Sequence, residues 1–232
     1  MPIHRTLNQN FFKTWTHEMA YVLGYFAADG SMIENVRGGY YIEITSTDIE
    51  LLQIVKRVTG STHKISTRPK RSENCNVSYR IQIGSTAWFS DLEKLGFTPN
   101  KSLTLSFPHV PQEYFGDFVR GYFDGDGCVY FKELQYADRK NKRWILMTLF
   151  TSGSQSFLKS LHRRLKEYNI RGGVVKPKGK GGFELVFSHR DSLALYKLLY
   201  KREQSSHLNL KRKREKLEKA IDVLNLNNEM RT

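Results

Sequence analysis

The chain has 232 residues, of which 39% are hydrophobic, and 37 Lys and Arg residues against 23 Asp and Glu residues give a formal net charge of +14. This composition is sufficient for a sizeable core, and the positive charge indicates an anionic partner, most often a nucleic acid. Two cysteines exclude a disulfide framework and favour a reducing compartment. Because the chain has no long apolar run and no signal-peptide core, we expect a soluble intracellular protein without a membrane segment.

In chain order, residues 1–16 form an N-terminal extension, after which the apolar pattern alternates between helical and strand spacing. The pattern predicts a helix ending near Ala28, a hairpin over residues 31–46, a helix from Asp48 to Gly60, a hairpin over residues 63–84, and a short helix closed by Gly96. Two prolines, Pro108 and Pro111, then interrupt the pattern.

The second half repeats this order. It predicts a helix ending at Gly125, a hairpin over residues 128–151, a helix from Ser154, a hairpin over residues 174–188, and a helix over residues 192–200. The basic segment over residues 208–224 is either one long helix or an extended stretch followed by a helix. Each half therefore has the order αββαββα, an internal repeat of about a hundred residues.

We expect an α+β fold with pseudo-twofold symmetry, with residues 17–111 and 112–232 as its halves. Each half should contain an antiparallel sheet with one buried and one wet face.

Two nearly identical stretches occur, one in each half, at residues 22–30 and 119–127. Each contains Gly-Tyr-Phe, one further residue, a small residue and Asp-Gly, and each follows apolar residues at helical spacing. We therefore expect Asp29 and Asp126 in the last turns of two helices. Gly30 and Gly127 are expected to end these helices because Gly tolerates the left-handed conformation.

Small residues form a second stripe on both predicted helices. Gly24 and Ala28 are four positions apart, and so are Gly121 and Gly125. Residues four apart share a helix face, and small side chains there allow two backbones to approach closely. Such a crossing would place the two motif carboxylates together, where a hard cation relieves their repulsion and the helix C-terminal ends favour it further. The alternative is that each Asp is only a helix-end residue before a turn.

These stretches resemble the two motifs of the single-chain LAGLIDADG homing endonucleases. The matching positions are Gly24, Phe26, Ala28, Asp29 and Gly30 in the first stretch, and Gly121, Phe123, Asp124, Gly125, Asp126 and Gly127 in the second. Ala27 departs from the family pattern, in which an acidic residue is common, but that position is not a metal ligand in the family. The resemblance extends over nearly the whole chain and implies a saddle of two sheets over DNA.

The resemblance also implies an activity: a monomeric endonuclease that cuts double-stranded DNA at a long, partly asymmetric target site. Asp29 and Asp126 are the expected Mg²⁺ ligands, assisted by the carbonyl groups of Ala28 and Gly125. Mn²⁺ is expected to substitute for Mg²⁺, and Ca²⁺ to bind without supporting cleavage. Metal ions held by carboxylates can activate water, neutralise the phosphate and stabilise the leaving oxygen.

Two lysines are similar to the family's active-site lysines, which would stabilise transition-state charge at each scissile phosphate. Lys101 lies in the segment Asn-Lys-Ser-Leu-Thr-Leu, and Lys211 lies in Leu-Asn-Leu-Lys-Arg-Lys. The alternative for Lys101 is a solvated loop lysine. For Lys211, within a run of four basic residues, the alternative is a phosphate-contacting or solvated helix face.

The hairpins carry the candidate DNA contacts, because a two-stranded ribbon fits the major groove. Arg80 and Gln82 share one strand face and have suitable chemistry for guanine and adenine edges. Cations that would position the duplex through its phosphates are Lys64, Arg68, Lys70, Arg139, Lys140, Arg143, Lys176, Lys178 and Lys180.

Two other functions compete with the endonuclease hypothesis. One is a non-cleaving nucleic-acid-binding relative, such as an RNA-splicing maturase or a regulator. Such relatives usually lack one motif acid, whereas both Asp29 and Asp126 are present in this chain. The other is a basic RNA-packaging protein, which does not explain the duplicated acids.

Overall fold

The computed structural model describes residues 5–70, 73, 76–135, 141–179, 181–201 and 207–224, and the chain divides into two compact units, Met1–Gly125 and Asp126–Thr232. The first unit contains α1 (His17–Asp29), β1 (Gly30–Glu34), β2 (Tyr40–Ser46), α2 (Ile49–Val58), β3 (Ile65–Arg68), β4 (Ser78–Gly84), α3 (Thr86–Lys94), a 3₁₀ turn at Gln112–Tyr114 and α4 (Phe115–Asp126). The second contains β5 (Gly127–Leu134), β6 (Arg143–Ser152), α5 (Gln155–Lys166), β7 (Val174–Lys178), β8 (Gly182–Phe187), α6 (His189–Tyr200) and α7 (Lys211–Val223).

The predicted αββαββα order and the α+β class are confirmed, with α4 opening the second repeat. The predicted boundary at residues 111 and 112 follows this repeat and stays a prediction, whereas packing groups almost all of α4 with the first unit. Residues 208–210 precede α7 outside any helix, so of the two alternatives for the basic segment the non-helical stretch followed by a helix is correct. In the part of the chain that the structure describes, no helix is long and apolar enough to span a bilayer.

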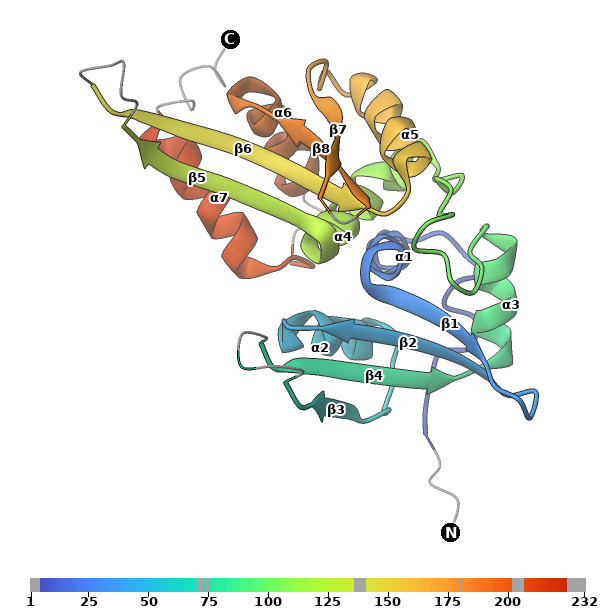
Figure 1. Cartoon of the computed structure of the whole chain (residues 1–232). Helices are drawn as coiled ribbons and strands as arrows, with labels where there is room; N and C mark the ends of the chain where they lie inside the picture. Colours follow the sequence, from blue (N-terminus) through green and yellow to red (C-terminus); the bar gives the residue numbers. More distant parts are fainter. Residues whose placement is uncertain are drawn as a thin grey trace. The chain divides into compact units, whose positions relative to one another are not determined.

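The first sheet is antiparallel with the strand order β1-β2-β4-β3. Strict alternation along β2 and β4 buries one face, because successive side chains point to opposite sides of a strand. The buried residues Ile42, Ile44, Ile81 and Ile83 lie on the side covered by α2, which packs on β2 and β4, and by α3, which packs on β2 (Figure 1). The other face, which carries the predicted reading residues Arg80 and Gln82, remains partly exposed.

The second sheet repeats this topology with the strand order β5-β6-β8-β7, again antiparallel throughout. Its buried face carries Leu146, Phe150, Leu185 and Phe187, against which α5 and α6 pack (Figure 1). Helix α7 packs on β5. Each unit therefore presents one exposed strand face, which we call the exposed face of its sheet.

Glycine ends the helices in two different ways. Gly60 and Gly96, which follow α2 and α3, have φ values of 61° and 90°, as expected for left-handed helix ends. The same expectation for Gly30 is wrong, because its φ of −88° and ψ of 157° are those of an extended residue entering β1. Gly30 is required for space instead, since a Cβ atom there would overlap the ring of Phe26.

Candidate catalytic helix ends and nucleic-acid interface

Helices α1 and α4 cross closely along their small residues. A Cβ atom at Gly24 would overlap the backbone carbonyl of Phe118, and one at Gly121 would overlap the backbone carbonyl of Tyr21. Contact between one helix backbone and the other leaves no room for a side chain at either glycine. The predicted close crossing is therefore confirmed.

The crossing continues to the C-terminal end of α1. A Cβ atom at Gly125 would lie 2.5 Å from the Cβ of Ala28 and 3.4 Å from Oδ2 of Asp29. Asp29 is the last residue of α1 and Asp126 the last residue of α4, and both are partly exposed. A helix end offers partial negative charge and carbonyl oxygens in addition to its carboxylate, which together suit a hard divalent cation.

The donor set at these helix ends is small. Among the described residues, no group of three or more His, Cys, Asp and Glu side chains could hold a metal ion. Carboxylates from the motif ends and backbone carbonyls are therefore the protein ligands to consider, and a six-coordinate cation there would take its remaining oxygens from water or a phosphate.

Lys101 lies against the end of α1. It is only 5% exposed, its Nζ donates a hydrogen bond to the carbonyl oxygen of Ala27 at 2.7 Å, and it lies 5.4 Å from the centre of the Phe26 ring. The negative end of the helix and the face of the ring both favour a cation at this position. Lys101 is therefore a buried lysine beside the first motif, and the alternative of a solvated loop lysine is wrong.

The second unit also has a buried lysine, but it is not the predicted one. Lys211 opens α7 and is exposed, whereas Lys213 is 6% exposed. Lysine is almost never so deeply buried without a specific role or partner. Helical spacing is a signal that would have found it, because Lys213 precedes the buried Leu217 by four positions and so shares the apolar face of α7.

A buried polar network links α1 to α4, and sequence reasoning did not anticipate it. Asp117 accepts from Arg120 at 2.7 Å and contacts Nδ1 of His17 at 2.8 Å. The Arg120 guanidinium lies 5.4 Å from the ring of Tyr21, whose hydroxyl donates to Asp124 at 2.8 Å. Burial and the neighbouring Asp124 carboxylate raise the pKa of Tyr21 well above its usual range, so this tyrosine remains a donor. These contacts join the two motif helices through buried charged and polar groups.

The exposed face of the first sheet gathers three predicted DNA contacts around one carboxylate. Glu43 accepts from Arg68 at 3.0 Å, from Arg80 at 3.3 Å and from the amide of Gln82 at 3.5 Å. We call this set the Glu43 cluster. The predicted Lys64 and Lys70 lie just before and just after β3 and are exposed.

The second sheet has a smaller cluster of the same kind. Glu184 pairs with Lys178 at 3.2 Å and with Lys176 at 3.9 Å. Arg143, another predicted contact, is exposed at the start of β6. The predicted contacts Arg139, Lys140 and Lys180 lie outside the described residues.

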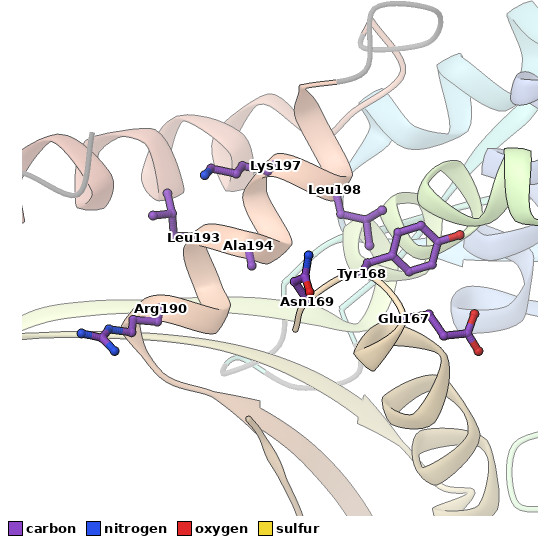
Figure 2. Close-up of a pocket in the computed structure, with 8 residues that line it drawn as sticks. All are labelled: Glu167, Tyr168, Asn169, Arg190, Leu193, Ala194, Lys197 and Leu198. Atoms are coloured by element: carbon purple, nitrogen blue, oxygen red, sulfur yellow. The ribbon is translucent and has the colours of Figure 1, made fainter. Parts of the chain in front are cut away.

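A pocket of about 490 Å³ lies elsewhere in the second unit, between the end of α5 and the helix α6 (Figure 2). Its lining residues are Glu167, Tyr168, Asn169, Arg190, Leu193, Ala194, Lys197 and Leu198. None of the residues predicted to bind DNA or metal is among them, so the candidate site is not this pocket but the helix ends and the exposed strand faces.

A duplicated αββαββα unit in which each motif helix ends in Asp and leads directly into a four-stranded antiparallel sheet is the fold of the LAGLIDADG proteins. Residues 16–94 match the family described as LAGLIDADG-like domain. The chain is similar to the LAGLIDADG family: the family model matches its first repeat, and solved structures of the family share the fold of the whole chain.

Two solved structures show the same fold over almost the whole chain. The LAGLIDADG homing endonuclease I-LtrWI, bound to target DNA, superposes with a TM-score of 0.59 at 12% identity, covering 94% of this chain and 92% of that one. I-SmaMI, bound to an uncleaved DNA target in the presence of calcium ions, gives a TM-score of 0.59 at 13% identity, covering 92% and 93%.

Two of the curated relatives are much longer proteins. The RNA polymerase subunit Rpo1C of Methanocaldococcus jannaschii is 26% identical over 213 residues, which is 90% of this chain and 21% of that protein. A probable translation initiation factor IF-2 of Thermococcus kodakarensis is 29% identical over 188 residues, 77% of this chain and 14% of that protein. The chain thus spans about a fifth or less of the length of these relatives.

Proposed function

We propose that the protein is a site-specific endonuclease that hydrolyses both strands of a double-stranded DNA target with the aid of divalent cations. The observation that carries this proposal is the glycine-lined crossing of α1 and α4, because each of these helices ends in an Asp. Packing of the two helices does not by itself require an Asp at the end of each. The retention of both acids therefore favours cleavage over a non-cleaving relative such as an RNA-splicing maturase.

The residues present fit a hard cation. Asp29 and Asp126 would hold it with their carboxylates, and the carbonyl groups of Ala28 and Gly125 would assist. Such a cation, when bound, activates water and neutralises charge on the phosphate. We propose Mg²⁺ as the cation, with Mn²⁺ as a substitute and Ca²⁺ as an ion that binds without supporting cleavage. The uncleaved DNA target in the calcium-containing structure of I-SmaMI is consistent with this assignment.

We propose that one buried lysine acts in each unit. Lys101, fixed by the carbonyl oxygen of Ala27, would stabilise charge that develops on the scissile phosphate. Lys213 has the matching burial in the second unit and is the better candidate there. The exposed Lys211, our first choice from the sequence, would then contact a backbone phosphate.

The strand faces would bind the duplex. Arg80 and Gln82 are proposed to read base edges, while Lys64, Arg68, Lys70, Arg143, Lys176 and Lys178 would contact phosphates, joined by Arg139, Lys140 and Lys180. Because both motifs are in one chain, a single copy supplies both acids. We therefore propose a monomer acting on a long, partly asymmetric site.

The relatives add support of a different kind. The same stretch of about two hundred residues matches parts of an RNA polymerase subunit and of a translation initiation factor, two proteins with unrelated activities. A segment that matches parts of two such different proteins is expected to carry a function separate from theirs, as a self-contained endonuclease would.

Selection from a randomised duplex library in the presence of Mg²⁺ tests the proposal. We expect one family of long targets to be cut on both strands. Enrichment of a bound duplex that is never cut would favour the non-cleaving alternative, and failure to enrich any duplex would overturn the DNA partner itself.

A further inference from the structure

The two sheets can be compared residue by residue, because their strands pair in the same register. Gly30 pairs with Ile44 in the first sheet, and Gly127 pairs with Phe150 in the second. Both glycines directly follow the motif Asp, so this pair anchors the comparison. Next to this pair, a row of residues runs across the strands on the exposed face. The side chains in this row are completely different in the two sheets.

In the first sheet this row is polar. Ser31 pairs with Glu43, and Glu43 pairs with Gln82 on the next strand. In the second sheet the same row carries no charge: Cys128 pairs with Leu149, Leu149 with Val186, and Val186 with Val174. We call these four residues, Cys128, Leu149, Val186 and Val174, the apolar row.

The apolar row is accessible to a ligand. Val174 is 64% exposed and Cys128 is exposed, while Leu149 and Val186 are partly exposed. Met147, which is also partly exposed, extends the row along β6 toward the exposed Arg143. An apolar strip that crosses a whole sheet on its exposed side contributes nothing to the core beneath the other face.

Positive charge lies on both sides of this row on the same face. Lys176 and Lys178 follow Val174 along β7 at two-residue spacing. Lys132 and Arg143 lie toward the other end of β5 and β6. An apolar strip between cations fits a ligand whose edges are anionic and whose middle carries apolar groups, which describes the major groove of DNA where thymine presents its C5-methyl group.

We propose that the exposed face of the second sheet reads thymine C5-methyl groups, with Leu149 and Val186 as the specificity-determining residues. This inference rests on the proposed function, since it names the base chemistry of one half of the DNA target. The half-site under the first sheet is read by hydrogen bonds from Arg80 and Gln82, and the half-site under the second sheet is read by contact with methyl groups.

Replacement of deoxythymidine by deoxyuridine tests the inference, because it removes the methyl group and keeps base pairing. The duplex is a target enriched from the randomised library, and affinity is measured without divalent cations so that no strand is cut. A photo-crosslinker on Cys128, in a Cys75→Ser variant, identifies the half-site under the second sheet. We expect each critical replacement in that half-site to weaken binding about threefold to fivefold, and replacements in the other half-site to change it less than twofold.

Two variants test whether the loss of affinity caused by deoxyuridine depends on the apolar row. In Leu149→Ala and Val186→Ala the deoxyuridine penalty should largely vanish, because the methyl group has lost its contact. The control Val223→Ala removes a 41% exposed apolar side chain from the end of α7 and should keep the full penalty. Circular dichroism melting of each variant shows whether its fold is retained.

Three results would overturn the inference while leaving the proposed function intact. They are an enriched target without thymine at the crosslinked half-site, a penalty that is equal in both half-sites, or a penalty that persists in Leu149→Ala and Val186→Ala. Sedimentation of the parent as a dimer that Leu149→Ala dissociates, without change in the penalty, would show that the row binds a second copy instead. If the library yields no bound duplex at all, the proposed function itself has failed.

Discussion

The first and second sheets share one topology and one register, yet one row of residues on their exposed faces is polar in the first sheet and apolar in the second. At matched positions the first sheet has Glu43 and Gln82 where the second has Leu149 and Val186. The buried faces, in contrast, are alike, with large apolar side chains in both. Packing constrains the buried face because a volume change there costs stability, whereas the exposed face is free to diverge with its ligand.

The carboxylates of the two sheets have also changed places. Thr45 pairs with Arg80 in the first sheet, and at the matched position Thr151 pairs with Glu184 in the second. The first sheet therefore has its acid on β2 and its cations on β3 and β4, while the second has its acid on β8 and its lysines on the edge strand β7. If the two sheets bind DNA as proposed, they would read different base sequences, so we expect an asymmetric target.

The largest loss of activity should come from changing the motif Asp, which both halves have in common. Asp29→Asn or Asp126→Asn should each reduce double-strand cleavage by about a thousandfold or more, because a carboxylate proposed to hold the cation becomes neutral. DNA affinity should stay the same or rise, since a negative charge near phosphates is lost. Cleavage assays on plasmid and short duplex, with binding assays beside them, measure both. Full cutting by both variants would remove the metal assignment.

The next effect concerns the helix crossing. A Cβ atom at Gly121 would overlap the carbonyl of Tyr21, so Gly121→Val must push α1 and α4 apart. We expect a stability loss of about 1–3 kcal/mol and a cleavage rate at least about a hundredfold lower, because a shift of about 1 Å is enough for such a loss. The Mg²⁺ requirement should rise as the paired ends separate.

The matched control is Leu51→Val, a change at a buried position on α2 away from the crossing. It should cost about 1 kcal/mol of stability and leave the cleavage rate close to that of the parent. Melting temperature, DNA affinity and cleavage rate are measured for both variants. If Gly121→Val cleaves like the parent, the helix crossing does not position the acids.

The lysines give a smaller effect that distinguishes the two units. Lys101→Met and Lys213→Met should each lower the cleavage rate about a hundredfold with little change in affinity, since each removes one charge proposed to act in the transition state. Lys211→Met should instead weaken binding to all sequences about equally and leave the cleavage rate unchanged at saturating protein. The opposite pattern for Lys211 and Lys213 would restore the assignment made from the sequence.

Local rules were sufficient for much of this molecule. Periodicity predicted the order of helices and strands, and the duplicated motif with its small residues predicted the close crossing. Gly30 was interpreted wrongly because a local rule about φ was applied where a tertiary contact with Phe26 decides. The link from His17 to Asp117 could not be predicted, because it depends on how two helices about a hundred residues apart meet in space.

The exposed faces were predicted only in part for a similar reason. Alternation placed Arg80 and Gln82 on one face, but strand register determines that Glu43 lies beside them on β2, where it also binds Arg68. Register across neighbouring strands depends on the turns and on core packing, which a single strand does not reveal. The apolar row could not be predicted for the same reason, because its members come from four strands and lie side by side only through the register of those strands.

The smallest predicted effect concerns Glu43 and Glu184, the carboxylates on the exposed faces of the two sheets. Glu43 is 12% exposed and binds two arginines at 3.0 and 3.3 Å, whereas Glu184 is 17% exposed and binds two lysines at 3.2 and 3.9 Å. Arginine pairs of this geometry hold their side chains more firmly than lysine pairs that are about half exposed. We therefore expect the Glu43 cluster to keep its cations away from phosphates more effectively than Glu184 does.

Glu43→Gln should consequently raise affinity for random-sequence duplex about threefold to tenfold and steepen its salt dependence by about one phosphate contact, because Arg68 and Arg80 become free to bind phosphates. Affinity for the selected target should rise less, so that discrimination falls. Glu184→Gln should produce the same change at no more than about half the size on a logarithmic scale. Glu133→Gln is the charge-matched control: it pairs with Lys142 at 3.8 Å outside both clusters and should leave the ratio of specific to random-sequence affinity unchanged. Equal effects for all three variants would mean that only net charge matters and that the two sheets do not differ in how they restrain their cations.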